Sequence, residues 1–397
     1  MLVIKELTID RLGGINHLEL KLHKGLNLIC GPNGVGKTTI LESIGHMFSR
    51  GGGHSKIKRN VKSEQGSCEI SYSELEGETR TSSYIIKKYE ENEAIDWHNS
   101  DANLANNVIV FKAERTFTYT RLDSLRQDTE KDESAVFNDS MNGIQFFDFK
   151  NWFIHRFLFN HVNDELTPAQ KNNFTLATEC FGILDGNIRF SRVKSDTFDI
   201  IINTPNGEIY FEYLSSGFKS CIYIIHGIIK EIEYRFKKDG GIKVQDYEGI
   251  VLIDELDLHL HPQWQARMIY LLKRVLPKAQ IIATTHSPHM VQAAEINEII
   301  ALGVNESGSV YVRQLPNVQY GFQGWTVEEI LEDVMGLVET RSPMYIEAVT
   351  EFEKSIVEEN EDRILEAYHK LDLMLHPSNP LRKLLKLQLA QFGRVIE

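Results

Sequence analysis

The sequence lacks the cysteine pattern of a disulfide-stapled or zinc-binding protein. Its 397 residues include four cysteines with no paired spacing, Cys30, Cys68, Cys180 and Cys221. Neither a disulfide framework nor a zinc site is therefore indicated. A cytoplasmic protein is the simplest interpretation, because disulfides accumulate in oxidising compartments.

Long apolar runs are also missing. The longest, at residues 221–229, is interrupted by His226 and is too short to span a bilayer. The first ten residues alternate like a strand and carry acidic side chains early, which is unlike a signal peptide. We therefore expect no membrane partner and a cytoplasmic location.

Positive charge is scarce. The chain has 43 Lys and Arg against 56 Asp and Glu, a formal net charge of −13. This balance argues against a basic surface for constitutive nucleic-acid binding. A local cluster follows the glycines at positions 51–53 and consists of Lys56, Lys58, Arg59 and Lys62. Two interpretations stay open for it: a solvated loop, or a loop that contacts the phosphates of DNA or RNA.

One contiguous motif is present in full. Residues 31–38 match the phosphate-binding pattern G-x-x-x-x-G-K-[ST] without a mismatch. The candidate nucleotide-binding residues are Gly31, Pro32, Asn33, Gly34, Val35, Gly36, Lys37, Thr38 and Thr39. An apolar strand precedes the loop and a helical run follows it, so phosphates would face backbone N–H groups at a helix N-terminus. The pattern predicts that Lys37 reaches the β- and γ-phosphates of ATP and that Thr38 binds Mg²⁺.

Two carboxylates follow a second apolar strand. Residues 250–253 are all apolar, and Asp254 and Glu255 come directly after them. Ligands bind at the carboxyl ends of the strands in α/β sheets. We therefore predict that Asp254 holds Mg²⁺ together with Thr38 and that Glu255 polarises the attacking water as general base. The alternative is a strand that simply ends in acids at the start of a helix.

A second phosphate-facing helix start is predicted at residues 214–217, which include Ser215, Ser216 and Gly217. One chain has no need of two such sites for one nucleotide. The economical solution is a head-to-tail homodimer, or a higher homo-oligomer, in which this segment closes over the nucleotide of the other subunit.

A histidine follows the apolar strand at residues 280–284, within the segment Thr284, Thr285, His286 and Ser287. An imidazole in that place can contact the γ-phosphate and report its loss. We therefore predict His286 as a catalytic residue beside Glu255 and Lys37.

The alternation of strand and helix patterns predicts an α/β fold with parallel βαβ units. We expect four regions: an ATPase lobe at residues 1–115, a helical insert at 116–185, a second ATPase lobe at 186–305, and a mainly helical C-terminal region at 306–397. The last region docks a partner, completes the dimer or caps the core; the sequence leaves these three roles open.

The motifs, in this order, resemble those of the ABC-type ATPases of the SMC/RecF/OLD branch. The resemblance covers about residues 1–305. It makes residues 31–38 the Walker A motif, 250–255 the Walker B motif, 214–217 the signature motif and His286 the switch histidine. It implies an ABC-type P-loop ATPase head with a mixed sheet that binds ATP and Mg²⁺.

Other positions refine the resemblance. Asp257 begins a segment similar to the D-loop of this branch, and we prefer that interpretation of His259 and His261 to a metal site, for which two ligands are weak support. No glutamine stands at residues 108–115, where a Q-loop is expected, and Phe218 replaces a common Gln or Glu. Long heptad repeats are lacking, so a short helical insert takes the place of coiled-coil arms.

The chain is most similar in character to the stand-alone antiphage-defence ATPases of the PtuA type, which belong to Septu and to certain retron systems. The resemblance implies a sensor and scaffold for a separate nuclease of the HNH type. No segment after residue 305 reads as the Toprim domain of OLD nucleases, so nuclease activity is expected in trans. The alternative is a RecF-like repair or recombination ATPase acting on DNA. A transporter cassette fits less well. A slow-hydrolysing switch, in which nucleotide occupancy and not turnover controls assembly, is compatible with all three roles.

Overall fold

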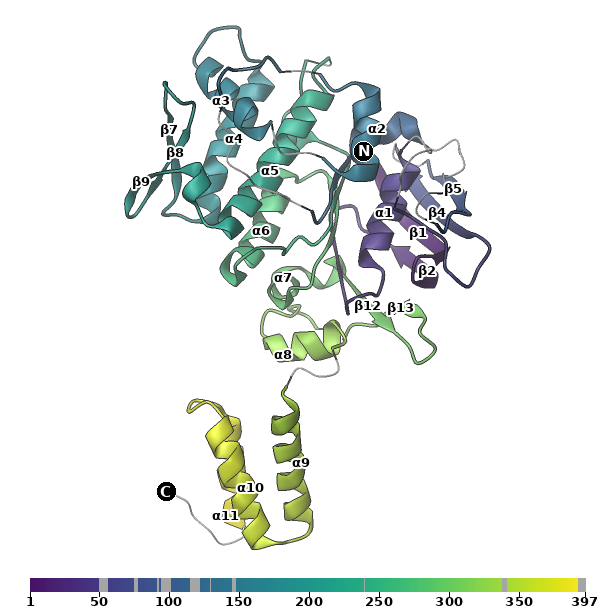
Figure 1. Cartoon of the computed structure of the whole chain (residues 1–397), viewed down its shortest axis with the longest axis vertical. Coiled ribbons are helices and arrows are strands. Elements are labelled where there is room, and N and C mark those ends of the chain that lie inside the picture. The colour runs from purple at the N-terminus through teal and green to yellow at the C-terminus, as the bar shows by residue number, and fades with distance from the viewer. Residues whose placement is uncertain are drawn as a thin grey trace. The chain divides into compact units, whose positions relative to one another are not determined.

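A computed structural model of the chain describes residues 1–49, 56–74, 78–90, 93, 101–114, 122–128, 130–144, 148–238, 240–316, 318–337 and 341–391. The glycines at positions 51–53 and residues 115–121, at the predicted start of the helical insert, lie outside the described residues. The chain divides into two compact units, Met1–Gly336 and Leu337–Glu397 (Figure 1).

A six-stranded sheet lies at the centre of the first unit, in the order β13-β12-β3-β11-β10-β6. The strands from β12 to β6 run parallel, and β13 pairs with β12 antiparallel. Their bounds are β3 (Leu26–Cys30), β6 (Val108–Phe111), β10 (Ile250–Ile253), β11 (Gln280–Thr284), β12 (Ile299–Val304) and β13 (Val310–Val312). β3, β11, β10 and β6 are buried along their whole length, as expected of a parallel sheet that is covered on both faces.

One face of the central sheet packs against helix α1 (Lys37–Met47) and an antiparallel sheet in the order β2-β1-β4-β5. The strands of that sheet are β1 (Val3–Leu12), β2 (Ile15–Lys21), β4 (Gly66–Ser73) and β5 (Arg80–Ile86). Ile250 and Leu252 of β10 contribute to the core on this side. Figure 1 shows α1 and the antiparallel sheet together beside the central strands.

The opposite face packs against a helical layer. Alternate residues of β10, Val251 and Ile253, share this second core with Trp152 and Ile225. The helices are α2 (Glu133–Asn142), α3 (Phe149–Phe159), α4 (Pro168–Leu184), α5 (Ser216–Arg235) and α6 (Pro262–Val275). A small antiparallel sheet, β7 (Arg189–Val193), β8 (Ile200–Thr204) and β9 (Gly207–Tyr210), adjoins α4.

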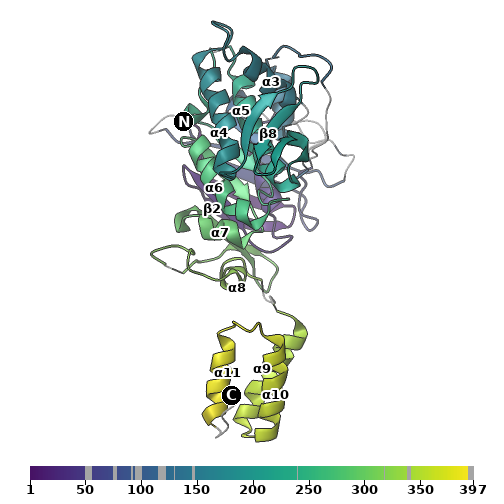
Figure 2. The same ribbon diagram turned by 90° about the vertical axis from the view of Figure 1, so that its left-hand side faces the viewer.

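The remaining elements of the first unit are short. They are η1 (Ala102–Asn107), η2 (Phe211–Tyr213), η3 (Val244–Asp246), α7 (Pro288–Ala293), η4 (Ile296–Glu298), α8 (Val327–Glu329) and the π-helix η5 (Ile330–Val334). The second unit contains α9 (Pro343–Val357), α10 (Glu361–Met374) and α11 (Leu381–Gln391), which pack around a hydrophobic core of their own (Figure 2).

The predicted fold class is confirmed. The first unit is an α/β domain whose parallel-rich sheet is mixed through β13, and the C-terminal region is helical. Between β6 and β7, the described residues contain α2, α3 and α4. The longest helix within the described part of the chain is α5, with 20 residues, so no long coiled-coil arm is formed there.

Candidate functional site

The phosphate-binding loop connects β3 to α1 at the carboxyl edge of the central sheet. Helix α1 begins at Lys37, and Gly36 before it has a left-handed backbone with φ of 100°. A Cβ atom on Gly36 would lie 2.8 Å from Cγ1 of Ile15, so both the backbone angle and the space select glycine here. The loop therefore presents backbone N–H groups at a helix N-terminus, as the sequence predicted.

Lys37 lies inside this loop, with 5% of its surface exposed. Its Nζ donates hydrogen bonds to the carbonyl oxygens of Gly31 and Pro32, both at 2.9 Å. Burial lowers the pKa of Lys37, although the charges of Asp257, Asp254 and Glu255 oppose the shift. The ammonium group is thus held where phosphates would lie.

Thr38 and Asp254 meet across the sheet edge. Thr38 Oγ1 lies 3.0 Å from Oδ2 and 3.3 Å from Oδ1 of Asp254, and Asp254 is buried. Mg²⁺ prefers hard oxygen ligands and usually takes one or two protein groups besides phosphate and water. A hydroxyl and a carboxylate in contact fit that preference, so these two residues would hold the metal.

Glu255 has an unusual backbone. Its φ is 47°, in the left-handed region that non-glycine residues seldom adopt. Its N–H donates to Oγ1 of Thr284 at 2.7 Å, and the next N–H, of Leu256, donates to the Thr284 carbonyl at 2.8 Å. The chain thus turns sharply straight after β10, directly behind the predicted metal ligand Asp254.

His286 and Asp257 are also joined. Oδ1 of Asp257 accepts from the backbone N–H of His286 at 3.0 Å and from the hydroxyl of Thr285 at 2.7 Å. Burial lowers the pKa of His286, and the positive charge of Lys37 adds to this effect. The imidazole is therefore mainly neutral at neutral pH. The structure brings the predicted Walker A, Walker B, D-loop and switch residues to one edge of the sheet.

The predicted signature residues lie at the start of α5. Ser215 is the N-cap, and its Oγ accepts from the N–H of Phe218 at 3.4 Å. Ser215 and Ser216 are exposed, whereas Gly217 is buried against the D-loop segment. A Cβ on Gly217 would lie 2.5 Å from the carbonyl oxygen of His259 and 3.0 Å from the ring of Trp264. The predicted signature segment thus contacts the predicted D-loop segment and leaves two serines exposed.

Two sequence details have structural explanations. Phe218 is buried against Trp264 and Phe181, so it stabilises the core beneath the signature. His261 is the N-cap of α6, its Nδ1 accepting from Gln263 N–H at 3.4 Å. Among the described residues, no group of three or more His, Cys, Asp and Glu side chains could hold a metal ion.

The basic cluster after the glycine run is partly engaged within the fold. Arg59 donates to the carbonyl oxygens of Lys87 and Ser63 and lies over the ring of Tyr89. Lys56 forms an exposed ion pair with Glu114 at 3.6 Å. These contacts support the interpretation of this segment as a solvated loop.

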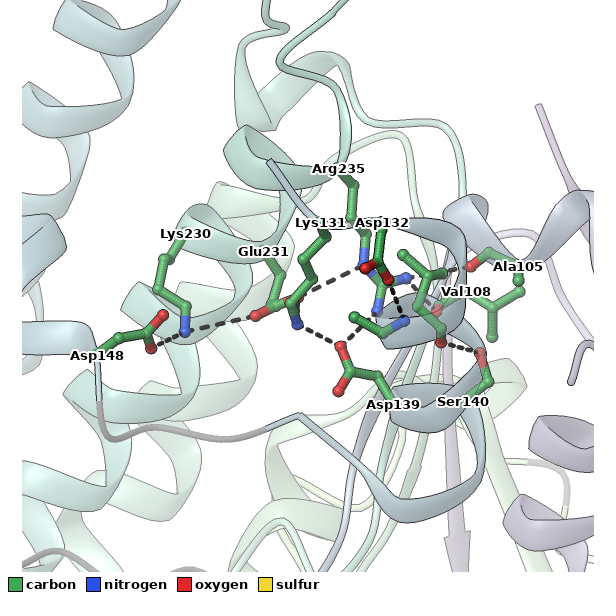
Figure 3. Close-up of polar contacts among 12 residues, drawn as sticks. Ala105, Val108, Lys131, Asp132, Asp139, Ser140, Asp148, Lys230, Glu231 and Arg235 are labelled. Atoms are coloured by element: carbon green, nitrogen blue, oxygen red, sulfur yellow. Dashed lines mark hydrogen bonds and ion pairs between the residues drawn. The ribbon is translucent and has the colours of Figure 1, made fainter. Parts of the chain in front are cut away.

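Sequence reasoning missed a buried ionic network on α5 (Figure 3). Glu231 has 0% exposure and meets three cations: its carboxylate lies 2.6 Å from Lys131, 3.4 Å from Lys230 and 3.5 Å from Arg235. Burial by itself would raise the pKa of Glu231, but these cations lower it below the ordinary value. The only sequence signal was a set of charged residues inside an otherwise apolar helix.

The network joins α5 to its neighbours. Asp139 of α2 pairs with Lys131 and with Arg235, and Asp148 pairs with Lys230. Arg235 also donates to the carbonyl oxygen of Val108 at 2.6 Å, at the start of β6 (Figure 3). The helix that begins with the signature is therefore fixed at its far end to the central sheet and to α2.

Fold and site together define a P-loop ATPase domain. The family described as "AAA domain, putative AbiEii toxin, Type IV TA system" matches residues 26–291. The chain is 79% identical over 397 residues to the Septu protein PtuA of Bacillus thuringiensis, with 100% of both chains covered. The chain belongs to the PtuA family, and the family predicted from the motifs is confirmed.

More distant relatives include two retron proteins. The retron Vc95 probable ATPase of Vibrio cholerae serotype O1 biovar El Tor is 25% identical over 358 residues, covering 70% of this chain and 68% of the relative. The retron Ec83 probable ATPase of Escherichia coli is 28% identical over 173 residues, covering 43% and 30%.

Similar solved structures include SMC head domains. That of Thermotoga maritima has a TM-score of 0.42 and 13% identity, covering 79% of this chain and 99% of the head domain. A Pyrococcus furiosus Smc head bound to the C-terminal domain of ScpA has a TM-score of 0.44 and 15% identity, covering 84% and 100%. Among the described residues, no helix has the length and apolar character needed to cross a membrane.

Proposed function

We propose that this protein binds ATP with Mg²⁺, hydrolyses it, and closes as a head-to-tail homodimer when ATP is bound. The observation that carries the proposal is the convergence of Lys37, Thr38, Asp254 and Glu255 at one sheet edge, with His286 beside them. Each of these side chains has the chemistry that phosphoryl transfer to water requires.

Each of these residues has its own proposed role in ATP hydrolysis. Thr38 and Asp254 would hold Mg²⁺, which would supply positive charge to the phosphates when bound. Lys37 places a further positive charge on the phosphates. Glu255 accepts the proton of the attacking water, a contribution of roughly 10²- to 10⁴-fold in rate. The neutral imidazole of His286 contacts the γ-phosphate.

The signature supports closure in trans. Ser215 and Ser216 are exposed at the N-terminus of α5, where backbone N–H groups and the helix dipole favour an anion. In the proposed dimer, these serines and Gly217 close over the γ-phosphate held by the other subunit. Asp257 contacts the same interface from the D-loop.

We further propose that the ATPase is the sensor and scaffold of an antiphage defence system and works with a separate nuclease of the HNH type. Membership in the PtuA family supports this role. The C-terminal region, residues 306–397, is proposed as the docking region, supported by the exposed apolar side chains Val357 and Leu373, which are 83% and 88% exposed. The division of residues 1–305 into two ATPase lobes around an insert at 116–185 stays part of this proposal.

Nucleotide binding tests the ATPase proposal. We expect the wild-type protein to bind a fluorescent ATP analogue and to release phosphate from ATP. Lys37→Ala should abolish both, because the loop loses its positive charge, while Lys24→Ala, at an exposed lysine, should match the wild type. Equal binding by Lys37→Ala and the wild type would remove the proposed site.

Co-purification tests the partner. The tagged protein is expressed with its native flanking genes, and mass spectrometry identifies what comes with it. A co-purifying nuclease, lost with Leu373→Glu but kept with the control Leu158→Glu on α3, would support docking through the C-terminal region. Recovery with DNA-repair proteins instead would favour the RecF-like alternative.

A further inference from the structure

Thr284 stands at the end of β11, beside the site but outside the motifs that bind nucleotide. β11 pairs in parallel with β10, and Ala283 lies in register with Ile253. Thr284 therefore lies next to the segment that follows β10, where Asp254 and Glu255 are placed. It is buried, with 1% of its surface exposed.

Three hydrogen bonds join Thr284 to this segment. Its Oγ1 donates to Oδ1 of Asp254 at 2.7 Å and accepts from the N–H of Glu255 at 2.7 Å. Its carbonyl oxygen accepts from the N–H of Leu256 at 2.8 Å. The hydroxyl donates its single proton to the carboxylate, and its oxygen accepts from the backbone N–H, so the direction of both hydrogen bonds is fixed.

These bonds act on the two groups whose positions matter most. Oδ1 of Asp254 accepts a hydrogen bond from the Thr284 hydroxyl, and Oδ2 accepts the shorter of the two hydrogen bonds from the Thr38 hydroxyl. The carboxylate is therefore oriented from two sides. Glu255 occupies a left-handed backbone that is costly for a non-glycine residue, and its N–H is held by the same hydroxyl.

We propose that Thr284 is a positioning residue: its hydroxyl orients the Asp254 carboxylate toward Mg²⁺ and holds Glu255 in the turn from which it serves as general base. This inference rests on the proposed ATPase function. Thr284 touches neither nucleotide nor water in this role; it acts through Asp254 and Glu255. Residues that orient metal ligands in this way typically change metal affinity or activity by about 10- to 100-fold when they are replaced.

Thr284→Val is the direct test, because valine keeps the branched shape and removes the hydroxyl. We expect the Mg²⁺ concentration for half-maximal binding of a fluorescent ATP analogue to rise about 10- to 100-fold, and kcat for ATP hydrolysis to fall by a similar factor. Binding of the same analogue in EDTA should stay at the wild-type level, because the phosphate loop is untouched. Thr175→Val, which removes an exposed hydroxyl on α4, should behave as the wild type.

Thr284→Ser distinguishes loss of the hydroxyl from a general disturbance of the fold, since it keeps the hydroxyl and loses only the methyl group. We expect it to restore the Mg²⁺ dependence to within about 3-fold of the wild type, a difference of about 0.7 kcal/mol, because the hydroxyl that forms both side-chain hydrogen bonds is retained. The proposal is overturned if serine is as defective as valine, if valine weakens binding equally in EDTA, or if valine matches the wild type. A wild-type protein that binds no nucleotide would instead overturn the proposed function, and this inference with it.

Discussion

The hydroxyl of Thr38 lies 3.0 Å from Oδ2 of Asp254, although 216 positions separate the two residues in the chain. Thr38 lies in the first turn of the helix that follows β3, and Asp254 follows β10; in the sheet only β11 stands between these strands. Because these strands are parallel, their carboxyl ends share one edge, and the contact follows from the sheet order. The proposed metal site is therefore created by topology and not by sequence proximity.

Glu255→Gln separates binding from hydrolysis. Glutamine keeps the size of the side chain but cannot accept the proton of the attacking water. We expect ATP binding close to the wild-type level and phosphate release slower by roughly 10²- to 10⁴-fold. Glu19→Gln, at an exposed glutamate of β2, is the matched control. Hydrolysis by Glu255→Gln at the wild-type rate would show that another group is the general base.

Ser215→Arg tests closure in trans. A large cation at this exposed N-cap removes the cap and fills the space where a second subunit would place its nucleotide. In the Glu255→Gln background, we expect each subunit to bind ATP while the ATP-dependent dimer, followed by light scattering after size exclusion, disappears. Ser195→Arg, also exposed, should leave the dimer intact. Persistence of the dimer with Ser215→Arg would contradict the head-to-tail arrangement.

The buried network predicts a large difference between two glutamates. Glu231→Gln leaves two buried cations, Lys230 and Arg235, and the partly buried Lys131 without their shared anion, so we expect the free energy of unfolding to fall by about 3–5 kcal/mol. Glu208→Gln breaks an exposed ion pair with Arg192 and should leave the free energy of unfolding close to the wild-type value. Urea unfolding followed by circular dichroism measures both. Equal losses would mean that the network does not stabilise the fold.

Acid should weaken the fold through His226. Burial lowers the pKa of this histidine from 6.5 to about 4, while its hydrogen bond to the Ala177 carbonyl opposes the shift. Between these two pH values, His226 therefore binds a proton in the unfolded chain and does not bind one in the folded chain. The contribution is fully present above about pH 6.5 and is lost as the pH falls toward 4, amounting to about 3 kcal/mol.

His226→Gln isolates this effect, because glutamine offers a donor to the Ala177 carbonyl and does not titrate. The free energy of unfolding, measured by denaturant at a series of pH values, should fall less steeply between pH 6.5 and 4 in the variant. Identical slopes for the variant and the wild type would assign the acid sensitivity to other groups.

The sequence predicted the fold, and it indicated candidate site residues where the signal was local. Residues 31–38 form a contiguous motif, and residues 250–255 combine four apolar side chains with two acids. Each can therefore be recognised without the rest of the chain. The strand before each motif indicated a parallel sheet, and that prediction is confirmed. The roles of Glu255 and His286 stay predictions.

Other features depend on pairings that the sequence does not reveal. The position of Thr284 depends on the register of β11 against β10. The carboxylate of Glu231 pairs with Lys131, which lies 100 positions away in the chain. The backbone of Glu255 is left-handed although glutamate has no preference for that region. Each follows from tertiary structure, which overrides local propensity.

Gly217 has no room for a side chain, because the carbonyl oxygen of His259 and the ring of Trp264 both lie against it. Trp264 is only partly buried, and it also contacts the ring of Phe218 edge-on. The molecule therefore carries an optical reporter at the signature: a rearrangement of the start of α5 changes the surroundings of this indole. With the other three tryptophans, Trp97, Trp152 and Trp325, replaced by phenylalanine, the emission of Trp264 would follow, in real time and without a label, how the predicted signature responds to nucleotide.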